Sequence, residues 1–158
     1  MKILVIGGCG FIGFNVFEYL KSKNYGKILI ADDLSGESSK KNLKIIKEKH
    51  KDINFKKIDI SNYITLANLI KKFKPSAILA LHGQVAVTKS IKNTKKDLNS
   101  NFLSIFNLLE CLRKYVPNSV LINLSSNKIY GPINELKILE KKTKYISKNQ
   151  INEKYPLN

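Results

Sequence analysis

The sequence predicts an α/β fold, in which a doubly wound parallel sheet carries helices on both faces. Three observations predict it. A buried-strand pattern at residues 2–6 runs into a glycine-rich turn at residues 7–13, apolar strands then alternate with helical segments, and polar motifs follow the strands. Strands and helices that alternate in this way form parallel sheets with right-handed crossovers. We expect the sheet to stop after about five strands.

Each glycine of the turn lacks a side chain for a different reason. Gly7 lets the strand turn sharply, Gly10 lets the backbone approach a pyrophosphate, and Gly13 lets the helix pack closely on the strand. The N-terminus of that helix favours an anion because its N–H groups are unpaired and the macrodipole is positive there. Many glycine-rich turns are only turns, but at a strand–helix boundary this one predicts a dinucleotide site in a Rossmann-type fold.

The remaining elements follow from apolar patterns and helix stops. Further strands are expected at residues 27–31, 53–60, 76–81 and 119–124, and helices after the glycine turn and at residues 36–52, 62–73 and 96–115. Apolar residues at helical spacing are expected to face the core: Ile12, Val16, Tyr19 and Leu20 in the first helix, Ile64, Ala67, Ile70 and Phe73 in the third, and Phe102, Ile105, Phe106, Leu109 and Leu112 in the last.

An acidic residue stands where a dinucleotide-binding fold needs one. Asp32 comes 19 positions after Gly13, close to the roughly 20 at which a carboxylate meets the adenosine ribose. A carboxylate there favours NAD, because it would repel the extra phosphate of NADP. Asp33 is a second candidate for this role, and the alternative is that Asp32 is an ordinary polar residue at a strand end.

Two more strand ends carry candidate groups. Asp59 and Ile60 end the third strand, where such a fold passes the adenine ring, although Asp59 could equally cap the next helix. His82 follows the fourth strand and could act as a general base, but a single histidine at a strand end is more often a satisfied structural group. Because all these motifs lie at carboxyl ends of strands, they predict one ligand crevice.

Composition limits the classes of protein. The 158 residues are enough for about one domain, and no apolar run approaches the roughly 18 residues that span a bilayer. The first strand begins at residue 2, which leaves no room for a targeting peptide, so we expect a cytoplasmic protein without a membrane partner. Cys9 and Cys111 have no metal-ligand spacing and predict neither a disulfide framework nor a metal site.

The formal net charge of +16 does not by itself predict nucleic-acid binding. Arg113 is the only arginine, and the lysines are scattered in pairs between elements rather than gathered on one helix. Lysine lacks the planar fork that recognises bases and phosphates in a bidentate way. We expect no nucleic-acid partner, but a positive field that speeds the arrival of an anionic nucleotide.

Together, the motifs resemble a known family. Residues 7–13, 32–35 and 59–60, with the Ser-Ser and Tyr-Gly pairs of residues 125–131, resemble the extended short-chain dehydrogenase/reductase family of NAD-dependent sugar-nucleotide epimerases and dehydratases. The resemblance covers about residues 1–135. Within the family, residues 83–91 and the Asn-Lys pair in residues 125–131 look like those of the CDP-paratose 2-epimerases (CDP-tyvelose epimerases).

The resemblance implies an NAD cofactor, a nucleotide-sugar substrate with a CDP-sugar favoured, and roles for individual residues. Hydride would leave a sugar carbon and return to the opposite face of a keto intermediate. By resemblance, Phe11 and Ile12 would lie at the pyrophosphate, Asp32, Asp33, Leu34 and Ser35 at the adenosine ribose, and Asp59 and Ile60 at adenine. Leu81, His82, Gly83 and Gln84 would line the crevice, Asn101 would order it, and Ser126 would hydrogen-bond the reacting sugar hydroxyl.

One family motif is missing, the Tyr-x-x-x-Lys pair that supplies the catalytic base. Tyr145 is followed by Lys148, one position too early, and Tyr130 has Asn134 where the lysine should stand. We therefore expect an NAD-binding domain at residues 1–131 and a polar loop region at residues 132–158 that leads to a missing catalytic motif and substrate domain. The fifth strand would then be a sheet edge that exposes apolar surface.

Several interpretations stay open. The chain could be the NAD-binding half of a nucleotide-sugar 2-epimerase, inactive alone, or a fragment of a sugar-nucleotide 4-epimerase or 4,6-dehydratase. It could also be a non-catalytic NAD-binding remnant, or a split-enzyme subunit that a C-terminal polypeptide completes. Homo-oligomerisation is a further expectation, because an apolar sheet edge favours association.

Overall fold

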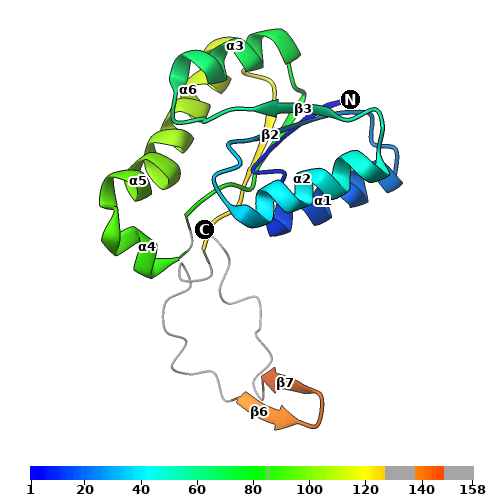
Figure 1. The fold of residues 1–158 in the computed structure, drawn as a ribbon, viewed down its shortest axis with the longest axis vertical. Coiled ribbons are helices and arrows are strands. Elements are labelled where there is room, and N and C mark those ends of the chain that lie inside the picture. Colours follow the sequence, from blue (N-terminus) through cyan, green and yellow to red (C-terminus); the bar gives the residue numbers. More distant parts are fainter. Residues whose placement is uncertain (85, 127–137, 148–158) are drawn as a thin grey trace. The chain divides into compact units, whose positions relative to one another are not determined.

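The computed structural model describes residues 1–84, 86–126 and 138–147, and its main feature is a five-stranded parallel sheet (Figure 1). The strand order is β3-β2-β1-β4-β5. These strands are β1 (Lys2–Ile6), β2 (Lys27–Asp32), β3 (Asn54–Lys57), β4 (Ala77–Ala80) and β5 (Val120–Asn123). All four pairings are parallel, which confirms the predicted doubly wound sheet.

Helices connect successive strands. They are α1 (Phe11–Ser22), α2 (Glu37–Lys49), α3 (Tyr63–Phe73), α4 (Val87–Lys92), α5 (Thr94–Leu98) and α6 (Ser104–Tyr115), with a π-helical turn, η1 (Asn99–Leu103), between α5 and α6. The helix predicted at residues 96–115 is confirmed as a helical run from Thr94 to Tyr115, in which η1 is a wider turn. The third, fourth and fifth strands are each shorter than predicted.

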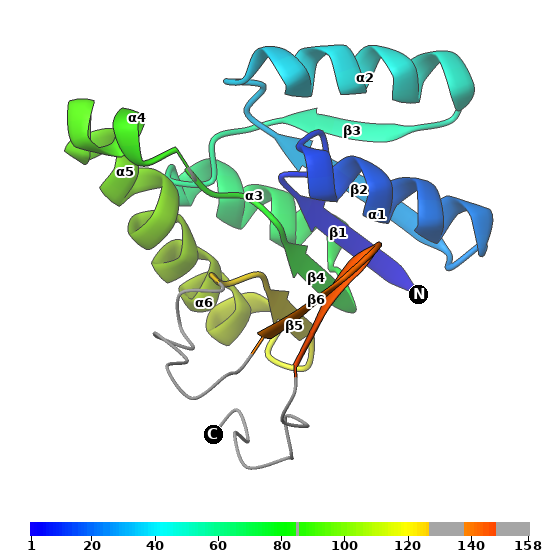
Figure 2. The same ribbon diagram turned by 90° about the horizontal axis from the view of Figure 1, so that it is seen from below.

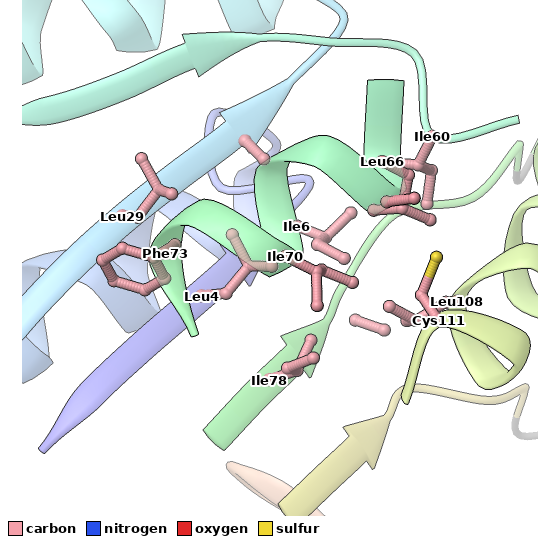
Figure 3. Close-up of a cluster of buried hydrophobic side chains, with 13 residues drawn as sticks. Leu4, Ile6, Leu29, Ile60, Leu66, Ile70, Phe73, Ile78, Leu108 and Cys111 are labelled. Carbon is pink, nitrogen blue, oxygen red and sulfur yellow. The ribbon is translucent and has the colours of Figure 1, made fainter. Parts of the chain in front are cut away.

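Alternating side chains of the strands build a separate core on each face of the sheet. On β1, Ile3 and Val5 pack in a cluster with Phe17 of α1 and Ile46 of α2. The intervening Leu4 and Ile6 lie in the other cluster, which α3 and α6 complete (Figure 3). Figure 2 shows α1 and α2 on one side of the sheet and α3 and α6 on the other. β1 is apolar in both registers because both of its faces are covered.

The predicted core faces of the first and last helices are right only in part: Leu20, Ile105 and Leu112 pack against the core clusters as predicted, and other residues do not. In α1, Phe17 is buried, whereas Ile12 and Tyr19 are exposed. In the last helix, Leu108 and Cys111 are buried together with polar side chains, whereas the side chains of Phe102, Phe106 and Leu109 are 65%, 53% and 50% exposed. The periodicity of an apolar pattern gives the face of a helix only when the other faces are polar, and these helices are apolar on two adjacent faces.

In α3 the sequence pattern was a better guide. Ala67, Ile70 and Phe73 are buried as predicted, together with Leu66, whereas Ile64 is exposed. The Asn62 side chain caps the helix by accepting a hydrogen bond from the N–H of Thr65. This cap marks the start of α3 at Tyr63.

The chain divides into two compact units, Met1–Leu124 and Ser125–Asn158. The first ends directly after β5, where the N–H of Leu124 donates to the carbonyl of Ala80. The predicted domain end at residue 131 lies outside the described residues. In the second, β6 (Ile138–Lys141) and β7 (Lys144–Ser147) form an antiparallel hairpin. Residues 132–158 were predicted as polar loop; a hairpin forms there because two short apolar-containing runs flank a two-residue turn.

Among the described residues, no helix combines the length and the apolar character needed to cross a membrane.

Candidate functional site

A pocket opens at the carboxyl ends of β1, β2 and β4, where the sequence predicted a ligand crevice. The strand order reverses between β1 and β4, which is where doubly wound sheets bind ligands. Ten of the residues selected from the sequence line this pocket: Gly7, Gly10, Asp32, Asp33, Ser35, Ile60, Leu81, His82, Gly83 and Gln84. The fold therefore gathers motifs that are up to 77 positions apart in the chain.

The loops after β1 and β4 are in close contact at this point. Gly7 has φ +72, and a Cβ atom placed on it would lie 2.7 Å from the backbone nitrogen of His82. A side chain at position 7 would therefore strain the backbone and also push the two loops apart. The absence of a side chain at Gly7 brings the two sides of the pocket together.

The glycine turn leads into α1 without a side-chain cap. Gly10 is the N-cap residue in extended conformation, and because it has no side chain it provides no side-chain cap for the first turn of the helix. A Cβ on Gly13 would overlap the carbonyl oxygen of Gly7, so the helix can approach the strand this closely only with glycine there. The uncapped N–H groups and the positive end of the helix dipole are suited to an anion.

Phe11 and Ile12 do not place their side chains in the pocket. Both are exposed, and neither lines it. A contact of these two residues with a pyrophosphate would therefore use their backbone N–H groups, and it remains a prediction.

Asp32 is held by two backbone donors. Its Oδ2 accepts a hydrogen bond from the N–H of Cys9 at 2.9 Å, and its Oδ1 accepts one from the N–H of Leu34 at 2.9 Å. The residue is only 7% exposed, and burial raises the pKa of its carboxyl group, although the two backbone hydrogen bonds oppose that effect. Each carboxylate oxygen has a second lone pair, so Asp32 can still accept ligand hydroxyl groups.

The residues after Asp32 differ from one another in their surroundings. Asp33 is exposed, and its Oδ1 accepts a hydrogen bond from the N–H of Ser35 at 2.9 Å. Leu34 has φ +58, and its side chain packs against the core cluster that contains Phe17 of α1 and Ile46 of α2. Leu34 therefore shapes the loop and does not line the pocket.

His82 is held by a chain of hydrogen bonds that begins in η1. Ser104 Oγ donates to the carbonyl of Ser100 at 2.7 Å and lies 2.9 Å from His82 Nε2. Since the serine hydroxyl has already donated its proton, His82 donates from Nε2 and carries no proton on Nδ1. Nδ1 is buried without a partner among the described residues.

Burial lowers the pKa of His82, and the charge of Asp33 only partly opposes this. The imidazole is therefore neutral near pH 7. A neutral ring whose Nε2 is already used in a hydrogen bond fits the structural role better than that of a general base.

Asn101 holds the loop that follows β4. Its Oδ1 accepts a hydrogen bond from the N–H of Gln84 at 2.8 Å, and its Nδ2 donates to the carbonyl of Gln84 at 3.1 Å. Nδ2 also donates to Asp97 Oδ1 at 3.0 Å. Asn101 itself does not line the pocket, so it orders the wall formed by Gln84.

Asp59 and Ile60 have different roles in the structure. Ile60 lines the pocket, whereas Asp59 does not and instead accepts a hydrogen bond from the N–H of Ser61 at 2.9 Å. Asp59 does not cap α3, because Asn62 is the N-cap residue of that helix. A contact of Asp59 with adenine remains a prediction.

Ser126 belongs to the second compact unit and is exposed. Its assignment to the substrate remains a prediction. Asn127 and Lys128, which carry the subfamily resemblance, lie outside the described residues.

Sequence reasoning missed several residues of the pocket wall, namely Ile6, Ala31, Ser39, Ile58, Lys96, Ser100 and Ser104. Ser100 and Ser104 lie beside Asn101 on successive turns of one helix and form a polar stripe. This stripe can be seen in the sequence, but the prediction for this helix considered only its apolar residues. No sequence motif distinguishes Lys96 from the many other lysines of the chain.

Comparison with known proteins gives a consistent result. Residues 4–149 match the family model described as GDP-mannose 4,6 dehydratase. The chain is 36% identical over 145 residues to the CDP-paratose 2-epimerase of Salmonella typhi, a match that covers 92% of this chain and 42% of that protein.

Solved structures agree. The dTDP-glucose 4,6-dehydratase of Bacillus anthracis in complex with NAD superposes with a TM-score of 0.72 at 26% identity, over 95% of this chain and 45% of that one. The UDP-glucose 4-epimerase of Thermus thermophilus in complex with NAD superposes with a TM-score of 0.62 at 28% identity. This match covers 73% of this chain and 34% of that one. The chain thus spans less than half the length of each of these relatives. It belongs to the GDP-mannose 4,6-dehydratase family, within the extended short-chain dehydrogenase/reductase proteins, as its motifs predicted.

Proposed function

We propose that this chain binds NAD as the N-terminal part of a nucleotide-sugar epimerase or dehydratase. The observation that carries the proposal is the hydrogen bond between the N–H of Cys9, in the glycine turn, and the carboxylate of Asp32. It joins the element that would receive the pyrophosphate to the one that would receive the adenosine ribose. Solved relatives with this fold contain NAD.

The residues of the pocket fit the parts of NAD. The uncapped first turn of α1 offers N–H groups to the pyrophosphate, with Gly10 leaving room for the backbone to approach it. Asp32 can accept the ribose hydroxyl groups. Ile58 and Ile60 supply an apolar wall that suits the adenine ring.

In the reaction that we propose, the chain contributes only part of the chemistry. When bound, NAD would take a hydride from a sugar carbon and return it. Ser126 would hydrogen-bond the sugar hydroxyl that loses its proton. Because the Tyr-x-x-x-Lys motif is missing, the 158 residues lack the base that removes this proton, and we expect the chain to need a second polypeptide or further sequence for turnover.

For the substrate, we propose a CDP-sugar and a 2-epimerase reaction. The 36% identity to a CDP-paratose 2-epimerase supports this, as does the Ser-Ser-Asn-Lys sequence at residues 125–128. Relatives named dTDP-glucose 4,6-dehydratase and UDP-glucose 4-epimerase support a dehydration or 4-epimerisation as the alternative. A non-catalytic NAD-binding protein is the remaining alternative.

Isothermal titration calorimetry with NAD and NADP tests the first part of the proposal. We expect NAD to bind more tightly than NADP, since Asp32 and Asp33 both face the pocket and would repel an added phosphate. A chain that is folded by circular dichroism and binds neither nucleotide would contradict the proposal.

The substrate assignment needs a separate assay. We expect the chain alone to convert no CDP-paratose, dTDP-glucose or UDP-glucose in a product assay by liquid chromatography. Adding the C-terminal part of a CDP-paratose 2-epimerase should restore epimerisation of the CDP-sugar in preference to the other two. Turnover by the 158 residues alone would show that the catalytic base has been misplaced.

A further inference from the structure

Lys96 of α5 stands where the candidate NAD pocket meets a second pocket. The second pocket lies between the β2–α2 connection, at Ser35 and Gly36, and the basic residues Lys89, Lys92 and Lys96 of α4 and α5. Ser35, Gln84 and Lys96 line both pockets. The two pockets therefore adjoin each other, and Lys96 lies at their boundary.

The charges around the NAD pocket are unbalanced without Lys96. Two carboxylates line it, those of Asp32 and Asp33, whereas Lys96 is the only lysine or arginine among the described residues that line it. The positive end of α1 corresponds to only about half an elementary charge. A further cation would stabilise a doubly negative pyrophosphate in this pocket, and Lys96 lines the pocket.

The ammonium group of Lys96 has no competing partner. In the described part of the chain, none of Lys89, Lys92 and Lys96 forms an ion pair. The nearby Asp97 is already engaged, because its Oδ1 accepts hydrogen bonds from Ser90 Oγ at 2.6 Å and from Asn101 Nδ2 at 3.0 Å. Asp97 also lines this pocket and keeps its negative charge, so the three lysines, which have no ion pair among the described residues, leave a net positive charge that attracts an anion.

We propose that Lys96 is a phosphate ligand of the nucleotide, which contacts the pyrophosphate from α5 while α1 contacts it from the glycine turn. This inference rests on the proposed NAD binding. Lys89 and Lys92 act at longer range by raising the potential of the second pocket. The flexible stem of a lysine lets a point charge reach the phosphate without a fixed geometry.

A matched pair of variants tests the assignment. Lys96→Met removes the charge and keeps the length of the side chain. Lys95→Met is the control, since Lys95 is an exposed neighbour in the same helix and lines neither pocket. Affinities for NAD, ADP and adenosine are measured for both variants and the wild-type chain, at low and at moderate salt, by calorimetry or by NMR titration.

We expect Lys96→Met to bind NAD and ADP about tenfold more weakly, as for the loss of one charge-assisted hydrogen bond, with the affinity for adenosine unchanged. The salt dependence of NAD affinity should also become shallower. Lys95→Met should match the wild-type chain. The comparison of ADP with adenosine separates a phosphate contact from a general disturbance of the pocket.

Three results would overturn the assignment. If Lys96→Met binds ADP as the wild-type chain does, Lys96 holds no phosphate. If it loses adenosine affinity equally, its role is structural. If the variant binds NADP more weakly but binds NAD as the wild-type chain does, Lys96 contacts the 2′-phosphate of NADP. None of these three results contradicts NAD binding by the wild-type chain. If the wild-type chain itself does not bind NAD, both the proposed function and this inference are wrong.

Discussion

The backbone N–H of Cys9 donates a hydrogen bond to Oδ2 of Asp32 at 2.9 Å, across 23 positions of the chain. This bond joins the glycine turn after β1 to the end of β2. The other carboxylate oxygen accepts from the N–H of Leu34, so Asp32 orders both loops at one side of the pocket. A residue selected for a ligand contact thus also holds the site together.

Replacing Asp32 by asparagine should destabilise the fold. An amide has one acceptor oxygen, so either the N–H of Cys9 or that of Leu34 would lose its partner, and an unsatisfied buried donor costs about 1–3 kcal/mol. Urea unfolding followed by circular dichroism measures the change. Asp33→Asn is the control: because Asp33 is exposed, its replacement should change the free energy of unfolding by less than about 0.5 kcal/mol. Equal midpoints for the two variants would contradict the role of Asp32.

The NAD affinity should fall on acidification earlier than an ordinary aspartate would cause. Burial raises the pKa of Asp32 above its usual value of 3.8, and the protonated carboxyl group is a poorer acceptor for ribose hydroxyl groups. Calorimetric titrations from pH 7 down to the lowest pH at which circular dichroism shows a folded chain should show the decrease, and Asp33→Asn should retain it. An affinity that stays constant over this whole range would argue against a ribose contact at Asp32.

His82 should make the fold less stable at mildly acidic pH. Burial lowers the pKa of His82 in the folded chain, whereas the unfolded chain keeps the usual value near 6.5. Below pH 6.5 the unfolded state therefore binds a proton that the folded state does not, and the free energy of unfolding decreases as the pH falls. This contribution is fully present above pH 6.5.

A variant separates His82 from the other titrating groups. The difference in unfolding free energy between the wild-type chain and His82→Asn should shrink between pH 7.5 and pH 5.5, since only the wild-type chain loses stability through this group. A difference that does not depend on pH would show that His82 is protonated equally in both states.

The two ends of the glycine turn should respond differently to a side chain. A Cβ on Gly10 would lie 3.2 Å from the carbonyl oxygen of Gly7, a tight contact that a small shift relieves, whereas one on Gly13 would overlap that oxygen. We expect Gly10→Val to stay folded and to lose detectable NAD binding, because the side chain blocks the backbone approach. Gly13→Val should unfold. Unchanged NAD affinity in Gly10→Val would exclude the phosphate-binding role of the turn.

The isolated chain should self-associate through exposed apolar side chains. Phe102 and Phe106 are more than half exposed on the helical segment before β5, and Val120 and Ile122 are exposed on β5 at the edge of the sheet. Sedimentation velocity should show oligomers whose fraction rises with concentration, and Phe106→Glu should reduce it. Ile64→Glu, at an exposed apolar position of α3, is the control. A cooperatively melting monomer at all concentrations would contradict this expectation.

Local patterns were enough for the parts of the site that depend on short stretches of chain. The glycine turn requires backbone freedom at fixed positions, and the distance from Gly13 to Asp32 is the length of one helix and one strand, so both can be recognised without a structure. The same holds for the order of strands and helices. The doubly wound sheet, with the pocket at its carboxyl edge, follows from these features.

Other parts depend on contacts between distant segments. The face that the last helix turns toward the sheet could not be read from its sequence, because η1 adds a wider turn and two adjacent faces are apolar. The fixed tautomer of His82 depends on Ser104, and the wall at Gln84 depends on Asn101. The family resemblance selected Asn101, whereas Ser104 does not stand out as a motif.

The sequence by itself determined the fold class, the glycine turn and the position of Asp32, because each is set by the periodicity or spacing of neighbouring residues. Only the tertiary structure decided that Cys9 holds Asp32, that Ser104 holds His82, and that Lys96, one among many lysines, faces the pocket. Side-chain periodicity records which residues share a face of an element, but which face meets which neighbour is decided by the packing of the whole chain.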